Sequence, residues 1–107
     1  MTTFDDRERA FETKYARDEE MAFRIVARRN RLVGEWAATL MKLTPEEADA
    51  YSKAVVHANF EEAGDGDVIR KLIGDLTAAG VETSEVDIRR ALDDQTIEAR
   101  RQMMSSE

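Results

Sequence analysis

The chain has 107 residues, of which 36% are charged and 42% hydrophobic, and it contains no cysteine and one proline. This composition is typical of one small helical domain, and it excludes disulfides and thiolate metal sites. Because His57 is the only histidine, neither a histidine cluster nor a Ser-His-Asp triad can form within one chain, and we expect no enzymatic activity, metal site or cofactor.

Helix start and stop signals divide the chain into four expected helices, at about 4–42, 45–63, 66–79 and 85–103. Thr44-Pro45-Glu46-Glu47 combines a capping box with proline at the first helical position. Gly64 and Gly80 are expected to end helices, because glycine adopts the left-handed conformation at low cost. Asp65 and Ser84 are expected to cap the helices that follow.

Apolar residues recur at three- and four-residue spacing in each segment, as they do on one face of a helix. The third segment carries the clearest face: Val68, Ile69, Leu72, Ile73 and Leu76. The fourth carries a second strip, Val86, Ile97 and Met104, that requires either a further neighbour or a contact surface. Gly34 and Gly74 lie inside helices and are expected to permit close helix packing. We therefore expect an all-α four-helix bundle.

The first segment is too long for such a bundle. At about 100° per residue, its apolar residues from Phe4 to Leu40 stay within one sector of about 80°. A helix of this length spans ~55 Å, whereas a domain of this size has a radius of gyration of only ~13 Å. Residues 1–20 carry eleven charges and only three large apolar side chains. We expect residues 1–20 to form a projecting arm, helical or disordered, and residues 21–107 to form the globular domain.

Three aromatic residues of the arm, Phe4, Phe11 and Tyr15, would share one face of a helix. This spacing is what a helix presents to a hydrophobic groove on another protein, and an isolated arm is expected to become ordered when it binds. The alternative is that the arm folds back and covers its own bundle.

Charge is distributed unevenly within the total of −7. The net charge is −3 over residues 1–20, +4 over 21–43 and −8 over 44–107. The basic segment is expected to pack beside acidic helices rather than to bind nucleic acid. Arg29 falls at the centre of the apolar sector, so its guanidinium needs a carboxylate, helix carbonyls or a partner. We favour an ion pair with a carboxylate of the same chain over a contact with another protein.

The remaining polar groups give weaker signals. Glu61, Glu62, Asp65 and Asp67 surround a glycine turn, but their order does not match a calcium-binding loop, so we interpret them as helix punctuation. His57 is interpreted as structural, with pH sensing as the alternative. The opening Met-Thr-Thr-Phe-Asp-Asp is acidic and no long apolar run follows, so we expect a cytoplasmic protein without direct membrane insertion.

Three stretches resemble a known family: FDDRERAFE at 4–12, ARRNRLVGEWAA at 27–38 and NFEEAGD at 59–65. With Lys14, Tyr15, Ala16 and Phe23, they are similar to the zeta-type inhibitory subunit of alphaproteobacterial F-type ATP synthases. The resemblance spans essentially the whole chain, is densest over residues 3–38 and thins beyond about residue 80.

The resemblance implies a four-helix protein that binds the alpha, beta and gamma subunits of the catalytic head and opposes ATP hydrolysis more than synthesis. It places the protein in the cytoplasm, peripheral to the inner membrane through ATP synthase. The N-terminal segment would wedge into a catalytic alpha/beta interface beside the rotor stalk. Carried over by position, the partner-binding residues are Phe4, Asp5, Asp6, Arg7, Glu8, Arg9, Phe11, Lys14 and Tyr15, with supporting contacts from Arg28 and Arg29.

Two other functions are compatible with the same residues. A cytoplasmic helical adaptor could bind a different protein groove through the same arm. A nucleic-acid-associated regulator could use Arg24, Arg28 and Arg31, and its affinity would have to fall steeply as salt rises.

Overall fold

The computed structural model describes the backbone of residues 3–58 and 64–105, and the side chains of residues 17–58 and 64–105. Four helices make up the described chain: α1 (Thr3–Leu40), α2 (Pro45–Ala58), α3 (Gly66–Ala78) and α4 (Glu85–Ser105). No strand occurs among these residues. The all-α class is confirmed, and the helix boundaries agree with the expected ones to within two residues except at the end of α2. There, the expected extension to residue 63 falls outside the described residues.

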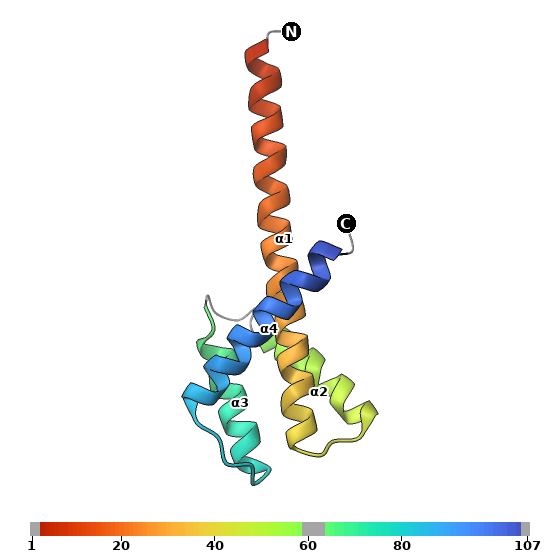
Figure 1. The fold of residues 1–107 in the computed structure, drawn as a ribbon, viewed down its shortest axis with the longest axis vertical. Coiled ribbons are helices and arrows are strands. Elements are labelled where there is room, and N and C mark those ends of the chain that lie inside the picture. The colour runs from red at the N-terminus through yellow and green to blue at the C-terminus, as the bar shows by residue number, and fades with distance from the viewer. Residues whose placement is uncertain (1–2, 59–63, 106–107) are drawn as a thin grey trace.

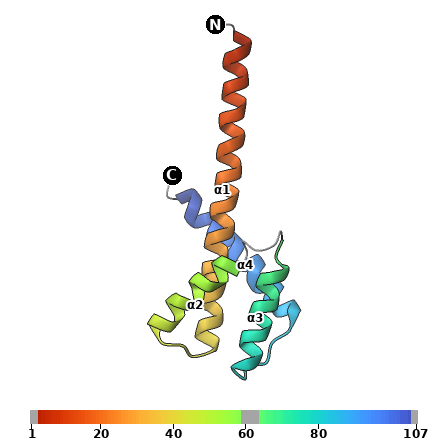
Figure 2. The ribbon, with the colours of Figure 1, turned by 180° about the vertical axis from the view of Figure 1, so that it is seen from behind.

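Helix α1 is the axis of the molecule (Figure 1). Its C-terminal half packs chiefly against α2 and α4, and α3 lies beside α2 and α4. The N-terminal half of α1 runs away from the other three helices, and the view from behind shows the same separation (Figure 2). The molecule measures 64 × 25 × 21 Å, with a radius of gyration of 17.4 Å. This exceeds the ~13 Å of a compact chain of about this length, so the predicted projection is confirmed.

The core lies where all four helices meet. One buried cluster joins nine residues: Val33, Ala37, Val55, Val68, Ile69, Leu72, Leu76, Ile88 and Leu92. Trp36, Met41, Tyr51, Ile73 and Val81 pack against its edges. The face that the spacing predicts for the third helix, Val68, Ile69, Leu72, Ile73 and Leu76, belongs to this core. Burial of apolar surface here is the main source of stability. The second strip of α4 has no such neighbour, because Val86, Ile97 and Met104 are exposed.

The predicted helix caps are present at two helix starts. The Thr44 backbone N–H donates to Glu47 Oε1 at 2.9 Å, and the Glu47 N–H donates to Thr44 Oγ1 at 3.2 Å. The bond from the Thr44 N–H holds the pKa of the Glu47 carboxyl below its usual range. At α4, the Asp87 N–H donates to Ser84 Oγ at 3.2 Å.

Asp65 corrects the expectation for α3. It occupies the N-cap position, but its side chain makes no capping hydrogen bond. The carboxylate instead pairs with Arg29 of α1, with Nη2 of Arg29 2.8 Å from Oδ1. A charge-assisted bond to a buried guanidinium outcompetes a bond to a solvent-accessible backbone N–H.

Helix α1 ends two residues earlier than expected. Lys42 adopts a φ of 58°, and the Leu43 N–H donates to the Ala38 carbonyl at 3.1 Å while the Lys42 N–H donates to the Thr39 carbonyl at 3.1 Å. These two bonds form a Schellman motif with lysine where glycine is usual. Gly80, with a φ of 79°, ends α3 in the same way.

The two helix glycines differ in their surroundings. A Cβ at Gly34 would lie 2.8 Å from Ser52 Cα, so Gly34 does permit α1 and α2 to pack closely. A Cβ at Gly74 would meet nothing within 4 Å. The expectation of close packing at Gly74 is therefore wrong, because no neighbouring helix lies against this position of α3.

Candidate partner-binding site

The N-terminal half of α1 holds most of the predicted partner-binding residues. Their backbone is helical, but the side chains of Phe4, Asp5, Asp6, Arg7, Glu8, Arg9, Phe11, Lys14 and Tyr15 lie outside the described side chains. The structure thus places the backbone of these residues on one projecting helix.

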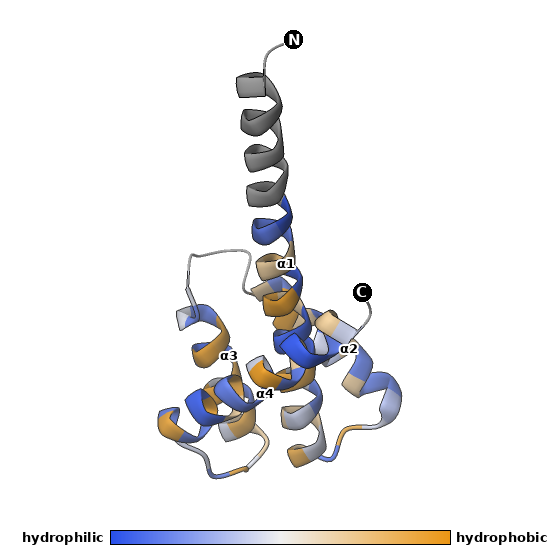
Figure 3. Ribbon diagram, turned by 45° about the horizontal axis from the view of Figure 1, so that its top comes forward, coloured by the Kyte–Doolittle hydropathy of each residue, from blue (hydrophilic) through white to orange (hydrophobic). Residues whose placement is uncertain are grey.

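The described part of α1 changes character along its length. Residues 17–20 are all exposed, and Figure 3 shows a hydrophilic turn there before apolar residues begin. Arg24 Nη2 forms an ion pair with Glu20 Oε1 at 2.7 Å on the surface. Among the described residues of α1, the first buried one is Arg29. The first turns of α1 with described side chains therefore contribute no buried residue to the bundle.

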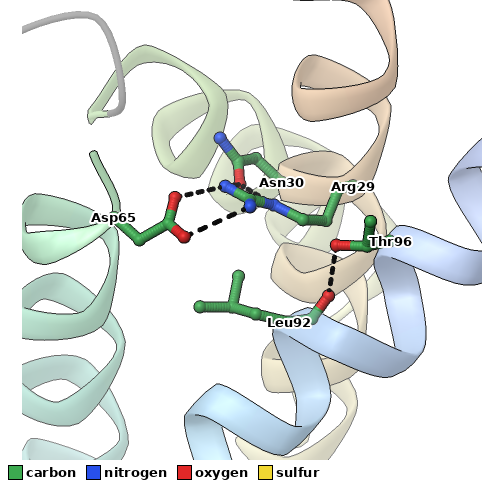
Figure 4. Close-up of polar contacts among 5 residues, drawn as sticks. All are labelled: Arg29, Asn30, Asp65, Leu92 and Thr96. Atoms are coloured by element: carbon green, nitrogen blue, oxygen red, sulfur yellow. Dashed lines mark hydrogen bonds and ion pairs between the residues drawn. The ribbon is translucent and has the colours of Figure 1, made fainter. Parts of the chain in front are cut away.

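Arg29 is 7% exposed and lies at the junction of three helices (Figure 4). Its Nη2 donates to Asp65 Oδ1 and to Asn30 Oδ1, both at 2.8 Å, and its Nε donates to Asn30 Oδ1 at 3.0 Å. This confirms the predicted internal ion pair. Little guanidinium surface is left for direct contact with another protein.

Asn30 completes this arrangement, and no sequence signal indicates its role beyond its place next to Arg29. It is fully buried and accepts both bonds from Arg29, while its Nδ2 has no hydrogen-bond partner among the described residues. Buried polar side chains are retained where they fix one geometry, since a misplaced one would be left unsatisfied. The Arg29-Asn30-Asp65 network therefore sets how the start of α3 meets α1.

Arg28 lies on a neighbouring face of α1 and is half-buried. It borders a depression of about 290 Å³ together with Ala27, Arg31, Lys53, Val56 and His57. Its Nε is buried without a hydrogen-bond partner among the described residues. Of the two supporting residues, Arg28 is the one whose side chain reaches a surface.

Arg31 joins α1 to α2 beside this depression. Its Nη2 lies 2.8 Å from Asp49 Oδ1, and Lys53 Nζ lies 3.0 Å from Asp49 Oδ2. Lys53 and then Arg31 hold the pKa of the Asp49 carboxyl below its usual range. Arg31 Nε also lies 3.5 Å from Glu35 Oε1, one turn further along α1. As expected, the basic segment is used in part to bind the acidic helices of the same chain.

The described carboxylates of the acidic turn at the start of α3 form ion pairs within the chain. Asp65 pairs with Arg29, and Asp67 pairs with Arg70. Glu61 and Glu62 lie outside the described residues. Over the part of the chain that the structure describes, no three histidine or carboxylate side chains are grouped so that they could hold a metal ion. No described helix combines the length and apolarity that crossing a membrane requires.

Comparison with known proteins places this architecture in a family. The family model described as ATPase inhibitor subunit zeta matches residues 1–102. A protein solved by solution NMR is 39% identical and superimposes with a TM-score of 0.72, over 81% of this chain and 99% of that one. No curated protein matches. With nearly its whole length matched, the chain belongs to the family of ATPase inhibitor zeta subunits.

Proposed function

We propose that this chain inhibits ATP hydrolysis by the catalytic head of the F-type ATP synthase, by inserting residues 1–20 into a catalytic alpha/beta interface near the rotor stalk. The observation that carries the proposal is the continuation of α1 beyond the bundle as one helix that begins at Thr3. Membership of the inhibitor family supports the role in general. A helix that leaves its own core offers a face to another protein.

The arm combines aromatic and charged side chains that suit insertion into a cleft between two subunits. Phe4, Phe11 and Tyr15 would fill apolar pockets in the cleft, and each buried aromatic side chain is worth ~1.5–3 kcal/mol. The charged side chains of the arm would pair with charges at the rim of the cleft, which favours register and specificity more than affinity. These residues are Asp5, Asp6, Arg7, Glu8, Arg9 and Lys14. Two or three docked aromatics offset the cost of holding a long arm in one conformation.

Residues 21–107 would act as the support that keeps the wedge in place. The Arg29-Asn30-Asp65 network fixes the part of α1 from which the arm departs. Arg28, beside the arm's base, offers a cationic contact for the enzyme. Arg29 would assist through the geometry of α1 rather than by contact. Inhibition would then be mechanical, exerted on the alpha, beta and gamma subunits in the cytoplasm at the membrane-bound enzyme.

An ATPase assay with the cognate catalytic head tests this mechanism. Full-length protein should inhibit hydrolysis, and a variant lacking residues 1–20 should not. The shortened variant should keep its melting temperature, because the buried residues that the structure describes begin at Arg29. A large fall in melting temperature would instead place the aromatics in the bundle's own core. Failure of the full-length protein to bind or inhibit would favour the adaptor function.

A further inference from the structure

A groove lies at the end of the bundle farthest from the arm. It has a volume of about 390 Å³ and is formed by the end of α1, the α3–α4 connection and the first half of α4. Trp36 and Leu40 of α1 and Val81 of the connection supply its apolar lining. Trp36 lies more than 30 residues from the start of α1, about 50 Å along the helix at ~1.5 Å per residue. This groove is therefore separate from the proposed wedge.

The groove's apolar lining remains accessible. Leu40 is 40% exposed, whereas Trp36 and Val81 are half-buried and rest against the core cluster. A groove of this volume that combines apolar groups with a few polar ones is typical of a site that receives a side chain or small ligand.

The rim of the groove is acidic. Glu82, Asp87 and Asp94 line it, against the single base Arg90, and all four side chains are exposed. None of the three carboxylates forms an ion pair with another described residue. In contrast, most described acids elsewhere in the bundle are held by arginine or lysine. Residues 44–107, which supply the whole rim, also carry a net charge of −8.

We propose that this groove binds a basic segment of another protein, in which a long aliphatic or aromatic side chain lies between lysine or arginine residues. The apolar side chain would rest on Trp36 and Leu40, and the flanking cations would pair with Glu82, Asp87 and Asp94. An acidic peptide would be repelled by the same rim. The chain's own residues 1–20 do not fit, because they carry a net charge of −3 and α1 leads them away from the groove.

Trp36 is the only tryptophan, so its fluorescence reports directly on the groove. The full-length protein should be titrated with the peptide acetyl-Lys-Arg-Leu-Arg-Lys-amide. We expect a saturable change in Trp36 emission that weakens as ionic strength rises to about 0.15 M, where screening acts over ~8 Å. Replacing the peptide's leucine by serine should weaken binding, and acetyl-Glu-Asp-Leu-Asp-Glu-amide should give no change.

Two variants of adjacent residues provide a matched control. Asp94→Asn removes a rim charge, whereas Asp93→Asn makes the same change in net charge at an exposed position that does not line the groove. Asp94→Asn should weaken peptide binding about two- to fivefold, the effect of a partly exposed ion pair, and Asp93→Asn should weaken it less. Leu40→Ser should also weaken binding, with the fold checked by circular dichroism.

Any one of the following results would overturn the proposal. They are the absence of a saturable signal with the basic peptide, an equal response to the acidic peptide, and equal binding by the Asp94→Asn and wild-type proteins. A change in Trp36 emission with protein concentration alone would identify a second copy of this chain as the occupant, and would also overturn it. Because the signal comes from Trp36 and not from ATP hydrolysis, these outcomes are independent of the proposed inhibitory function.

Discussion

Arg29 on α1 and Asp65 at the start of α3 are paired across 36 positions of sequence, with Nη2 of the guanidinium 2.8 Å from Oδ1 of the carboxylate. The arginine side chain is 9% exposed and the aspartate side chain 42% exposed. The pair therefore joins a buried cation to an anion that water still reaches. Such a pair lowers the cost of burying Arg29 and fixes where the start of α3 meets α1.

Asp65→Asn should destabilise the protein by about 1–2 kcal/mol, because it removes the negative charge that compensates the buried guanidinium of Arg29. Urea unfolding measures this. Asp67→Asn is the control, since Asp67 pairs with the exposed Arg70 and its loss should cost less. In a double-mutant cycle with Arg29→Met, strict additivity would show that the two side chains are not coupled.

Gly34 and Gly74 should respond oppositely to alanine. A methyl group at Gly34 would lie 2.8 Å from Ser52 Cα and 3.3 Å from Val55 Cγ2, and Gly34→Ala should destabilise the bundle by about 1–3 kcal/mol because two backbones must separate. Gly74→Ala meets open space and should stabilise by about 0.5–1 kcal/mol through the helix preference of alanine. Thermal unfolding of both variants decides this. Equal effects in the same direction would contradict the packing described at Gly34.

Tyr51 should resist ionisation in the folded protein. Burial, followed by the bond that its hydroxyl donates to Asp75 Oδ2 at 2.8 Å, raises the pKa of Tyr51 well above its usual range. An unfolded tyrosine has a pKa of about 10. The stability from protonated Tyr51 is thus complete below about pH 10 and is lost as the pH rises through the folded pKa.

Phenolate absorbance tests the raised pKa of Tyr51. It is measured in a Tyr15→Phe background, where Tyr51 is the only tyrosine. The folded protein should titrate at higher pH than the protein in urea, and Asp75→Asn should narrow the difference. Coincident titration curves for the folded and unfolded forms would show that Tyr51 is not held in this environment.

Phe4→Ala and Phe11→Ala should each weaken inhibition of ATP hydrolysis if these side chains anchor the wedge. Loss of one anchor worth ~1.5–3 kcal/mol corresponds to a rise of about 10- to 150-fold in the inhibitory concentration. Potency is measured in an ATPase titration, and melting temperature serves as the control for folding. Unchanged potency in both variants, with the bundle intact, would remove Phe4 and Phe11 from the proposed interface.

Local chemistry accounts for what the sequence predicted correctly. The reciprocal bonds between Thr44 and Glu47 need only four consecutive residues. The stripe of Val68, Leu72 and Leu76 needs only helical spacing, and all three are fully buried. The length of the first helix against the size of a small domain was enough to predict that α1 projects. The Schellman motif at Lys42 escaped prediction because its local sequence lacks the glycine that marks such an end.

By itself, the sequence determined the four helices, their core faces, the projecting arm and the need of Arg29 for a partner. Only the tertiary structure decided which partner that is, because Asp65 is 36 positions away and its local role would have been a helix cap. Packing also decided that α1 meets α2 closely at Gly34, whereas no neighbouring atom lies close to Gly74. The groove at Trp36 exists only because the α3–α4 connection brings an acidic rim to the end of α1. Helical periodicity acts over a few residues, whereas the position of one helix on another depends on the whole core.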